Sequence, residues 1–139
     1  MAFSYSVHAD LNLLFMRYSG CVSLNDQRRL VRYLASDDVY RPELAKLCDS
    51  SSLVEANLRL SDLIALRDRL HARYVGLPGP ILWAHYAPSD YAFGMARMWN
   101  MLLEEIPAIH CEVFSHAEET LEFLGMNRPE IANRLGLAI

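Results

Sequence analysis

The sequence predicts an α/β fold in which an N-terminal β-hairpin is followed by alternating helices and strands. Two observations lead to this prediction. Segments with the period of a β-strand alternate with segments with the period of an amphipathic helix, and the 139 residues, 53% hydrophobic and 22% charged, suffice for one packed core. After the hairpin, the alternation requires parallel strands joined by right-handed crossovers, giving a mixed five-stranded sheet with helices packed on it.

The chain opens with two strands. Positions 3, 5 and 7 are apolar and positions 4, 6 and 8 are polar, as in a half-buried strand. A second apolar run, residues 11–20, follows a short polar interruption, so we expect an antiparallel hairpin that turns at Asp10 and Asn12. Gly20 is expected to end the second strand.

A helix is expected next, from Ser23 to the aspartates Asp37 and Asp38. Ser23 is a favourable N-cap, and Asp26 stands three residues later, close to a capping box. The arginines at positions 28, 29 and 32 lie away from the apolar positions 24, 30, 31 and 34 and are expected to form a solvated face.

Further strands and helices alternate after this point. The expected strands are short apolar runs bounded by turn residues, at residues 44–49, 81–87 and 110–115. The second helix is expected to start with Ser61 as its cap, and the third with Ser89 as its cap.

The end of the chain contains two shorter helical segments. Ser115 opens a capping box for a fourth helix, which Gly125 is expected to stop, and Pro129 suits the first position of a short last helix. We therefore divide the chain into a domain of residues 1–126 and a C-terminal helical tail of residues 127–139 that docks weakly.

Charge and cysteine content exclude several classes of protein. With 13 basic and 17 acidic side chains, the net charge of -4 offers nucleic acid no global attraction. Cys21, Cys48 and Cys111 form no CxxC pair, so we expect small apolar core residues in a reducing compartment. The N-terminus lacks a basic region and has no uninterrupted apolar run, so we expect neither a signal peptide nor a membrane span, and a cytoplasmic protein.

Patterns that would carry catalysis are not found in the sequence. The histidines at positions 8, 71, 85, 110 and 116 show no metal-ligand spacing, and there is no GxSxG, phosphate-binding glycine loop or GxGxxG. We therefore predict no bound metal, no cofactor and no enzymatic activity.

Four stretches, "YSGCVSLND", "KLCDSSS", "FGMARMWNML" and "VFSHAEETLEFLG", stand in an order that resembles the STAS-like (SpoIIAA-like) branch of the superfamily named after sulphate transporters and anti-sigma-factor antagonists. The resemblance covers residues 3–125 and implies a SpoIIAA/STAS-like fold. In the phosphorylatable antagonists, the central strand ends in an Asp, and a separate Asp-Ser-Ser-Gly stands at the start of the next helix. Aligning Asp49 with the strand Asp puts Asn57 to Leu60 at the switch position, so the switch serine has no counterpart.

The stretch Asp49 to Ser52 has two interpretations. It looks like a phosphorylation site, but it comes too early for the family's switch, and short polar side chains commonly hydrogen-bond to local backbone in loops. We favour a polar loop. Ser61 is a second place where a phosphate would be tolerated, because a helix N-terminus favours negative charge.

A binding site in an open parallel sheet lies beyond the carboxyl ends of the strands, where helix N-termini converge. In this sequence, residues 49–52 and 87–90 supply that edge. The candidate binding residues are Asp49, Ser50, Ser52, Ser89, Asp90 and Arg97.

The third helix is apolar over most of its circumference. Its polar residues Arg97, Asn100 and Glu104 form one narrow stripe, and the candidate interface residues are Phe93, Met95, Met98, Trp99 and Leu102. We expect that such a helix cannot pack on one face of the sheet and leave half of its surface exposed to water. Three explanations stay open: cover by other parts of the chain, in particular the C-terminal tail, a homodimer interface, or a pocket for an apolar ligand.

Two residues of this helix carry separate expectations. Gly94 is expected to permit close approach of another backbone. Arg97 is expected to pair with a carboxylate such as Asp49 or Glu104, or to face an anionic group on a partner.

These observations favour a non-enzymatic module for protein interaction or ligand sensing, forming a homodimer through the third helix. Its protein partner and pathway are not specified by the sequence. The alternative is a carrier of an apolar or lipid-like small molecule beside the third helix.

Overall fold

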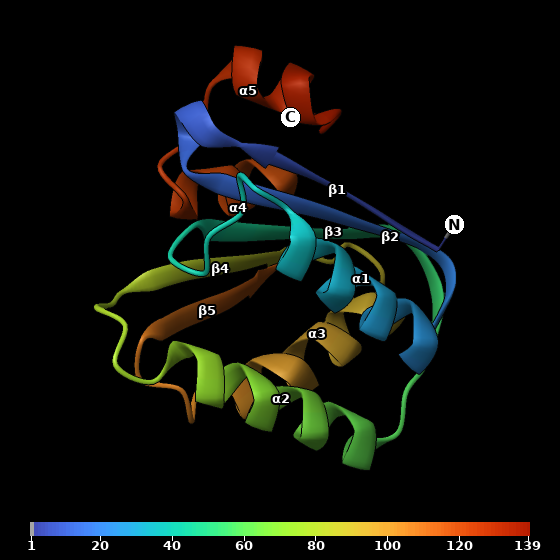
Figure 1. Ribbon diagram of the computed structural model, residues 1–139. Helices are drawn as coiled ribbons and strands as arrows, with labels where there is room; N and C mark the ends of the chain where they lie inside the picture. Colours follow the sequence, from blue (N-terminus) through green and yellow to red (C-terminus); the bar gives the residue numbers. More distant parts are fainter. Residues whose placement is uncertain (1) are drawn as a thin grey trace.

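The computed structural model describes residues 2–139. Its five-stranded sheet has the strands in sequence order (Figure 1). The strands are β1 (Phe3–His8), β2 (Leu13–Ser23), β3 (Ala45–Asn57), β4 (Ile81–Tyr86) and β5 (Ile109–Phe114). β1 pairs antiparallel with β2, and every other neighbouring pair is parallel. The predicted mixed sheet is confirmed.

Helices cover both faces of this sheet. They are the short 3-10 helix η1 (Ala9–Leu11), and α1 (Leu24–Ser36), α2 (Leu60–Tyr74), α3 (Asp90–Leu103), α4 (Ala117–Phe123) and α5 (Pro129–Leu135). Figure 1 shows α1, α2 and α3 on one face, and α4 and α5 on the other. Parallel strands are normally buried on both faces, and here each face has its own apolar core.

Side chains alternate between these two cores along the central strand β3. Cys48 packs with Leu30 and Leu103 on the face of α1, α2 and α3, whereas Leu47 packs with Leu121 and Ile131 on the opposite face. A polar residue in β3 is therefore assigned to one face by its position in the strand.

The predicted hairpin is confirmed. β1 and β2 pair from Phe3 with Tyr18 to His8 with Leu13. The connection is η1 followed by Asn12, whose φ of 50° lies in the left-handed region that Asn tolerates better than most residues.

Two strands are longer than expected. β2 continues through Gly20 to Ser23, and β3 continues through the four residues from Asp49 to Ser52 as far as Asn57. The expected strand end at Gly20 and the expected loop after Asp49 are both wrong. The reason is non-local, because β2 and β3 hydrogen-bond to each other along these segments, with irregular register near Gly20.

This extension forms a two-stranded arm beyond the rest of the sheet. β4 pairs with β3 only as far as Asp49, so the remainder of β3 has β2 as its neighbour. Tyr91 of α3 supports the arm, since its hydroxyl accepts a hydrogen bond of 2.9 Å from the Ala56 backbone N–H. Cys21 lies in this arm and is exposed, so the expectation of a core residue is wrong for Cys21 and confirmed for Cys48 and Cys111.

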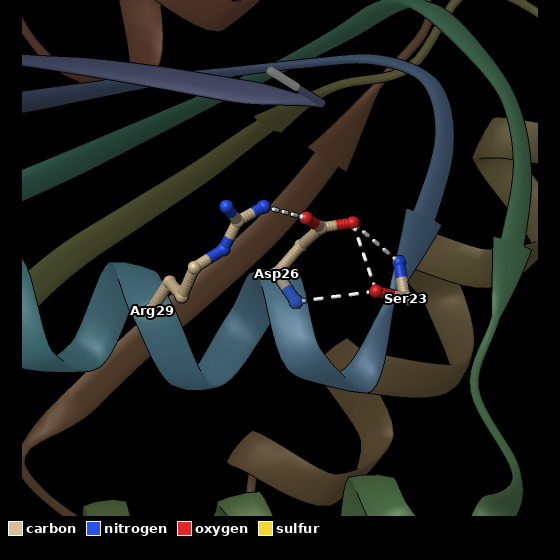
Figure 2. Close-up of polar contacts among 3 residues, drawn as sticks. All are labelled: Ser23, Asp26 and Arg29. Carbon is tan, nitrogen blue, oxygen red and sulfur yellow. Dashed lines mark hydrogen bonds and ion pairs between the residues drawn. The ribbon is translucent and has the colours of Figure 1, made fainter.

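The capping box predicted for α1 is confirmed (Figure 2). The Asp26 backbone N–H donates to Ser23 Oγ at 3.2 Å, and the Ser23 backbone N–H donates to Asp26 Oδ2 at 2.9 Å. Arg29 donates to the other carboxylate oxygen at 2.5 Å. The hydrogen bond from the Ser23 backbone, followed by that from Arg29, lowers the pKa of Asp26.

Of the other predicted helix starts, the structure confirms some and contradicts others. Ser89 caps α3 as predicted, accepting a hydrogen bond of 3.1 Å from the Ala92 N–H. α2 instead begins at Leu60, with Arg59 at the N-cap, and Ser61 lies in its first turn. The capping box predicted from Ser115 is wrong, because α4 starts at Ala117 and its N-cap makes no side-chain hydrogen bond.

The C-terminal segment packs on the α4 face. Pro129 is the first residue of α5 as predicted, and Ile131 and Leu135 are buried with Leu13 and Phe15 of β2. The predicted cover of the third helix by this tail is therefore wrong, because α5 and α3 lie on opposite faces of the sheet (Figure 1). The division at residue 126 stays a prediction.

Candidate functional site

A cavity of about 190 Å³ lies between the sheet and helices α1, α2 and α3. Its lining comes from β2, β3 and β4 and from all three helices. A cavity of roughly 150 Å³ in an engineered protein core is enough to hold one benzene molecule. The volume here therefore fits a small molecule with a single ring or a short chain.

The walls of this cavity are mainly apolar. Leu14 and Met16 of β2 and Trp83 of β4 lie on the sheet side. The helices contribute Leu30, Val31 and Leu34 from α1, Leu63, Leu66 and Leu70 from α2, and Ala92, Met95, Ala96 and Trp99 from α3. No Asp or Glu lines the cavity among residues 2–139.

Lys46 lines one part of the cavity and is only 1% exposed to solvent. Its Nζ donates hydrogen bonds to the backbone carbonyls of Pro42 and Leu44, the latter at 2.6 Å. The same atom lies 4.9 Å from the centre of the Tyr74 ring and 5.8 Å from that of Trp83. Burial lowers the pKa of Lys46 to about 7. Backbone oxygens and aromatic faces thus stabilise this amine within the fold.

His85 is the second buried titratable residue of the lining. It is 6% exposed and stacks on Trp83, with the ring centroids 6.4 Å apart. Its Nε2 has no hydrogen-bond partner in the part of the chain that the structure describes. Burial lowers the pKa of His85 to about 4, so its imidazole is neutral near pH 7. It can offer a hydrogen bond to a polar atom of a bound molecule.

The cavity approaches the surface at α2. Among its lining residues, the two that are exposed are Arg69 and Arg73. We call this pair of arginines the mouth of the cavity.

The candidate residues predicted on β3 do not form one cluster. Ser50 is 7% exposed and lines the cavity, whereas Asp49 belongs to the opposite face and is 1% exposed. Asp49 forms an ion pair of 2.8 Å with Arg17 and accepts a hydrogen bond of 2.9 Å from the Ser51 N–H. Ser52 is exposed. The expected local hydrogen bond is present, but in a strand.

The other candidate binding residues lie on α3. Ser89 and Asp90 are exposed at its N-terminus, where Ser89 serves as the cap. Arg97 is exposed and takes part in none of the ion pairs found within residues 2–139. The predicted pairing with Asp49 is wrong because Arg17 occupies that carboxylate, and no ion pair joins Arg97 to Glu104.

The candidate interface residues point in different directions. Phe93, Met95 and Trp99 pack within the chain, and Leu102 is half-buried. Met98 is 39% exposed, and Met101, which lies one turn further along the helix, is 64% exposed. The helix therefore does expose part of its apolar surface to water.

Gly94 lies on this exposed part of α3. A Cβ atom placed there would meet no atom within 4 Å from any other described part of the chain, so the expected close approach by another backbone of this chain is wrong.

The sequence did not identify Lys46, Arg69, Arg73 or, as a site residue, His85. Lys46 and His85 had a recognisable signal, because each is a lone basic or titratable residue within an apolar strand pattern. The two arginines had none, because nothing in their local spacing marks them as part of a cavity lining.

Other chemistry finds little support in the described residues. Burial raises the pKa of the Cys48 thiol to about 12 and also raises that of Cys111, so neither is a thiolate near pH 7. Residues 2–139 contain no group of three or more His, Cys, Asp or Glu side chains that could hold a metal ion. None of the helices they form combines the length and apolar character needed to cross a bilayer.

The sequence matches no protein-family model and no curated protein. Its structure is similar to the crystal structure of an uncharacterized protein of the DUF3478 family, with a SpoIIAA-like fold, from Shewanella loihica PV-4. The two share a TM-score of 0.59 and 16% sequence identity, over 88% of this chain and 94% of that one. The chain therefore has a SpoIIAA-like fold, as the resemblance in its sequence implied.

Proposed function

Starting from the SpoIIAA-like fold, we propose that this chain is a non-enzymatic ligand-binding module that holds a small apolar molecule beside α3. The observation that carries the proposal is the cavity of about 190 Å³ with its mainly apolar lining. Binding pockets in proteins are typically concave and apolar, with few polar groups that fix the orientation of the ligand. His85 and Ser50 supply such groups here.

The energetics of core packing support an occupant. Protein interiors are close-packed, and empty volume in a core costs roughly 24 cal/mol for each Å³. For about 190 Å³ this is at most about 5 kcal/mol, since the cavity is partly open to solvent at its mouth. A ligand that fills the space would restore these contacts and stabilise the fold by linkage.

The test compares neutral apolar ligands with a variant that fills the cavity. Indole and 1-octanol are expected to raise the Tm of the wild-type protein. Ala96→Leu, which adds a branched side chain at a lining residue, should abolish this rise while keeping the unliganded Tm at or above the wild-type value. Ala65→Leu makes the same change at an exposed position of α2 outside the cavity and should leave the rise intact.

The proposal fails if neither ligand raises the Tm, or if Ala96→Leu responds as strongly as the wild-type protein. Native mass spectrometry of protein purified without organic solvent adds a second readout, because a co-purified small molecule should be absent from Ala96→Leu.

We further propose a homodimer through α3, on the strength of its exposed methionines. Met98 and Met101 lie next to Gly94 on one side of the helix, and Met is common at interfaces. Sedimentation velocity is expected to show a dimer for the wild-type protein and a monomer for Met98→Glu/Met101→Glu. A wild-type protein that stays monomeric at high concentration would contradict the dimer and leave the cavity proposal standing.

A further inference from the structure

The mouth of the cavity carries two positive charges. Arg69 and Arg73 are four residues apart on α2, so they lie one turn apart on the same side of the helix. Both line the cavity, and both are exposed. Each guanidinium can therefore reach a group that sits where the cavity opens.

These two charges are not neutralised by the protein. Within residues 2–139, neither Arg69 nor Arg73 takes part in an ion pair, and the cavity lining contains no carboxylate. Arg67 of the same helix behaves differently, since it pairs with Asp68 at 2.8 Å and also with Glu105. The exposed Glu43 forms no ion pair with either mouth arginine.

Lys46, the one lysine of the lining, already has hydrogen-bond partners within the fold. Its Nζ donates to two backbone carbonyls and lies among aromatic rings. An anionic group of a ligand would thus find its partners at the mouth and not at Lys46. This places a charged end outside and an apolar end inside.

We propose that the ligand is a small anionic amphiphile, whose apolar part fills the cavity and whose carboxylate or phosphate group lies between Arg69 and Arg73. The planar fork of an arginine side chain matches the geometry of both anionic groups. This inference rests on the proposed function, because it specifies the class of molecule that the same cavity binds.

The experiment is calorimetric titration with three probes that share one chain: octanoate, octyl phosphate and 1-octanol. We expect at least one of the anions to bind about tenfold more tightly than 1-octanol, since a hydrogen bond to a charged group contributes on this scale. The preference should shrink as salt is added, because the arginines are exposed. A larger gain for octanoate assigns a carboxylate head, and a larger gain for octyl phosphate assigns a phosphate head.

A pair of double variants separates the mouth from general surface charge. Arg69→Gln/Arg73→Gln should bind all three probes with the affinity that the wild-type protein has for 1-octanol. Arg28→Gln/Arg32→Gln removes two exposed arginines at the same spacing on α1, outside the cavity lining, and should keep the preference for the anion.

Two results would overturn the inference. One is equal binding of 1-octanol and both anions to the wild-type protein, and the other is a preference that survives in Arg69→Gln/Arg73→Gln. In both cases binding of 1-octanol would leave the proposed function intact. If 1-octanol also fails to bind, the proposed function fails with the inference.

Discussion

At the scale of single residues, the buried polar groups differ in how far the fold satisfies their hydrogen bonds. Lys46 has backbone carbonyls and aromatic rings around its amine, and Asp49 has Arg17 and a backbone N–H. Within residues 2–139, His85 has no hydrogen-bond partner for Nε2. Because an unpaired buried polar group is costly, the state of His85 should respond to acidic pH and to a ligand.

His85 should make stability fall on the acid side of neutrality. Its pKa is about 4 in the folded chain and near the ordinary value of 6.5 in the unfolded chain, so the unfolded chain binds the proton more tightly between these values. The free energy of unfolding should therefore drop by up to about 3 kcal/mol as the pH falls from 6.5 to 4. Urea titrations across this range measure the drop.

The variant His85→Leu should lose most of that drop, and His71→Leu, at an exposed position, should keep it. His8, whose pKa burial also lowers, contributes a smaller slope that remains in both variants. Asp26 and Asp37 have lowered pKa values and therefore act below the window of His85. An unchanged slope in His85→Leu would contradict the assignment.

The ion pair between Arg17 and Asp49 should be asymmetric in its effect on stability. Asp49 is buried, whereas the Arg17 side chain is 36% exposed. Arg17→Met leaves a buried carboxylate unpaired and also removes the hydrogen bond to the Leu135 carbonyl, so we expect a loss of about 3–5 kcal/mol. Asp49→Asn keeps an acceptor for the Ser51 N–H and should cost clearly less. Chemical denaturation distinguishes the two, and equal losses would contradict this account.

At the scale of helices and strands, local signals in the sequence predicted three of five helix starts, and those at Ser61 and Ser115 were wrong. Ser23, Ser89 and Pro129 mark helix starts through contacts within a few residues, and the structure confirms all three. The continuation of β3 beyond Asp49 was not predictable in this way. It depends on hydrogen bonds to β2, and the serines at positions 50 to 52 are typical of turns when no neighbouring strand is known.

The helix caps allow a direct comparison of a real capping box with one that the sequence wrongly predicts. Ser23→Ala should lower the free energy of unfolding by about 1 kcal/mol, because the Asp26 N–H loses its acceptor. Ser115→Ala should have no measurable effect, since the N-cap of α4 makes no side-chain hydrogen bond. Equal effects of the two substitutions in thermal unfolding would contradict the observed caps.

The last helix, α5, is expected to contribute to the free energy of unfolding of the whole domain. Removing residues 127–139 would expose Leu13 and Leu121, which are both 0% exposed in the folded chain. We expect the shortened chain to lose cooperative unfolding and to bind hydrophobic dyes. Removing only the exposed residues 138 and 139 is the control. A shortened chain as stable as the full one would instead support weak docking of the tail.

At the scale of the whole molecule, one sheet separates two cores of different character. The core under α4 and α5 holds the C-terminal segment, while the core under α1, α2 and α3 contains the cavity. The sequence predicts a mixed sheet with helices packed on it, because the alternation of strand and helix periods requires parallel strands joined by crossovers. It also allowed an apolar pocket beside α3 as one of three alternatives. The volume of the cavity and its mouth could not be predicted, since they depend on how three helices are spaced over the sheet.

The methionines provide the most direct test of the claim that this cavity is a ligand site. Met16 and Met95 line it, Met98 and Met101 are exposed, and Met126 lies in the opposite core. In NMR spectra of protein labelled at methionine methyl groups, added octanoate should shift Met16 and Met95 and give intermolecular contacts to them. Shifts confined to Met98 and Met101, or no shift at any methionine, would contradict a ligand inside the fold.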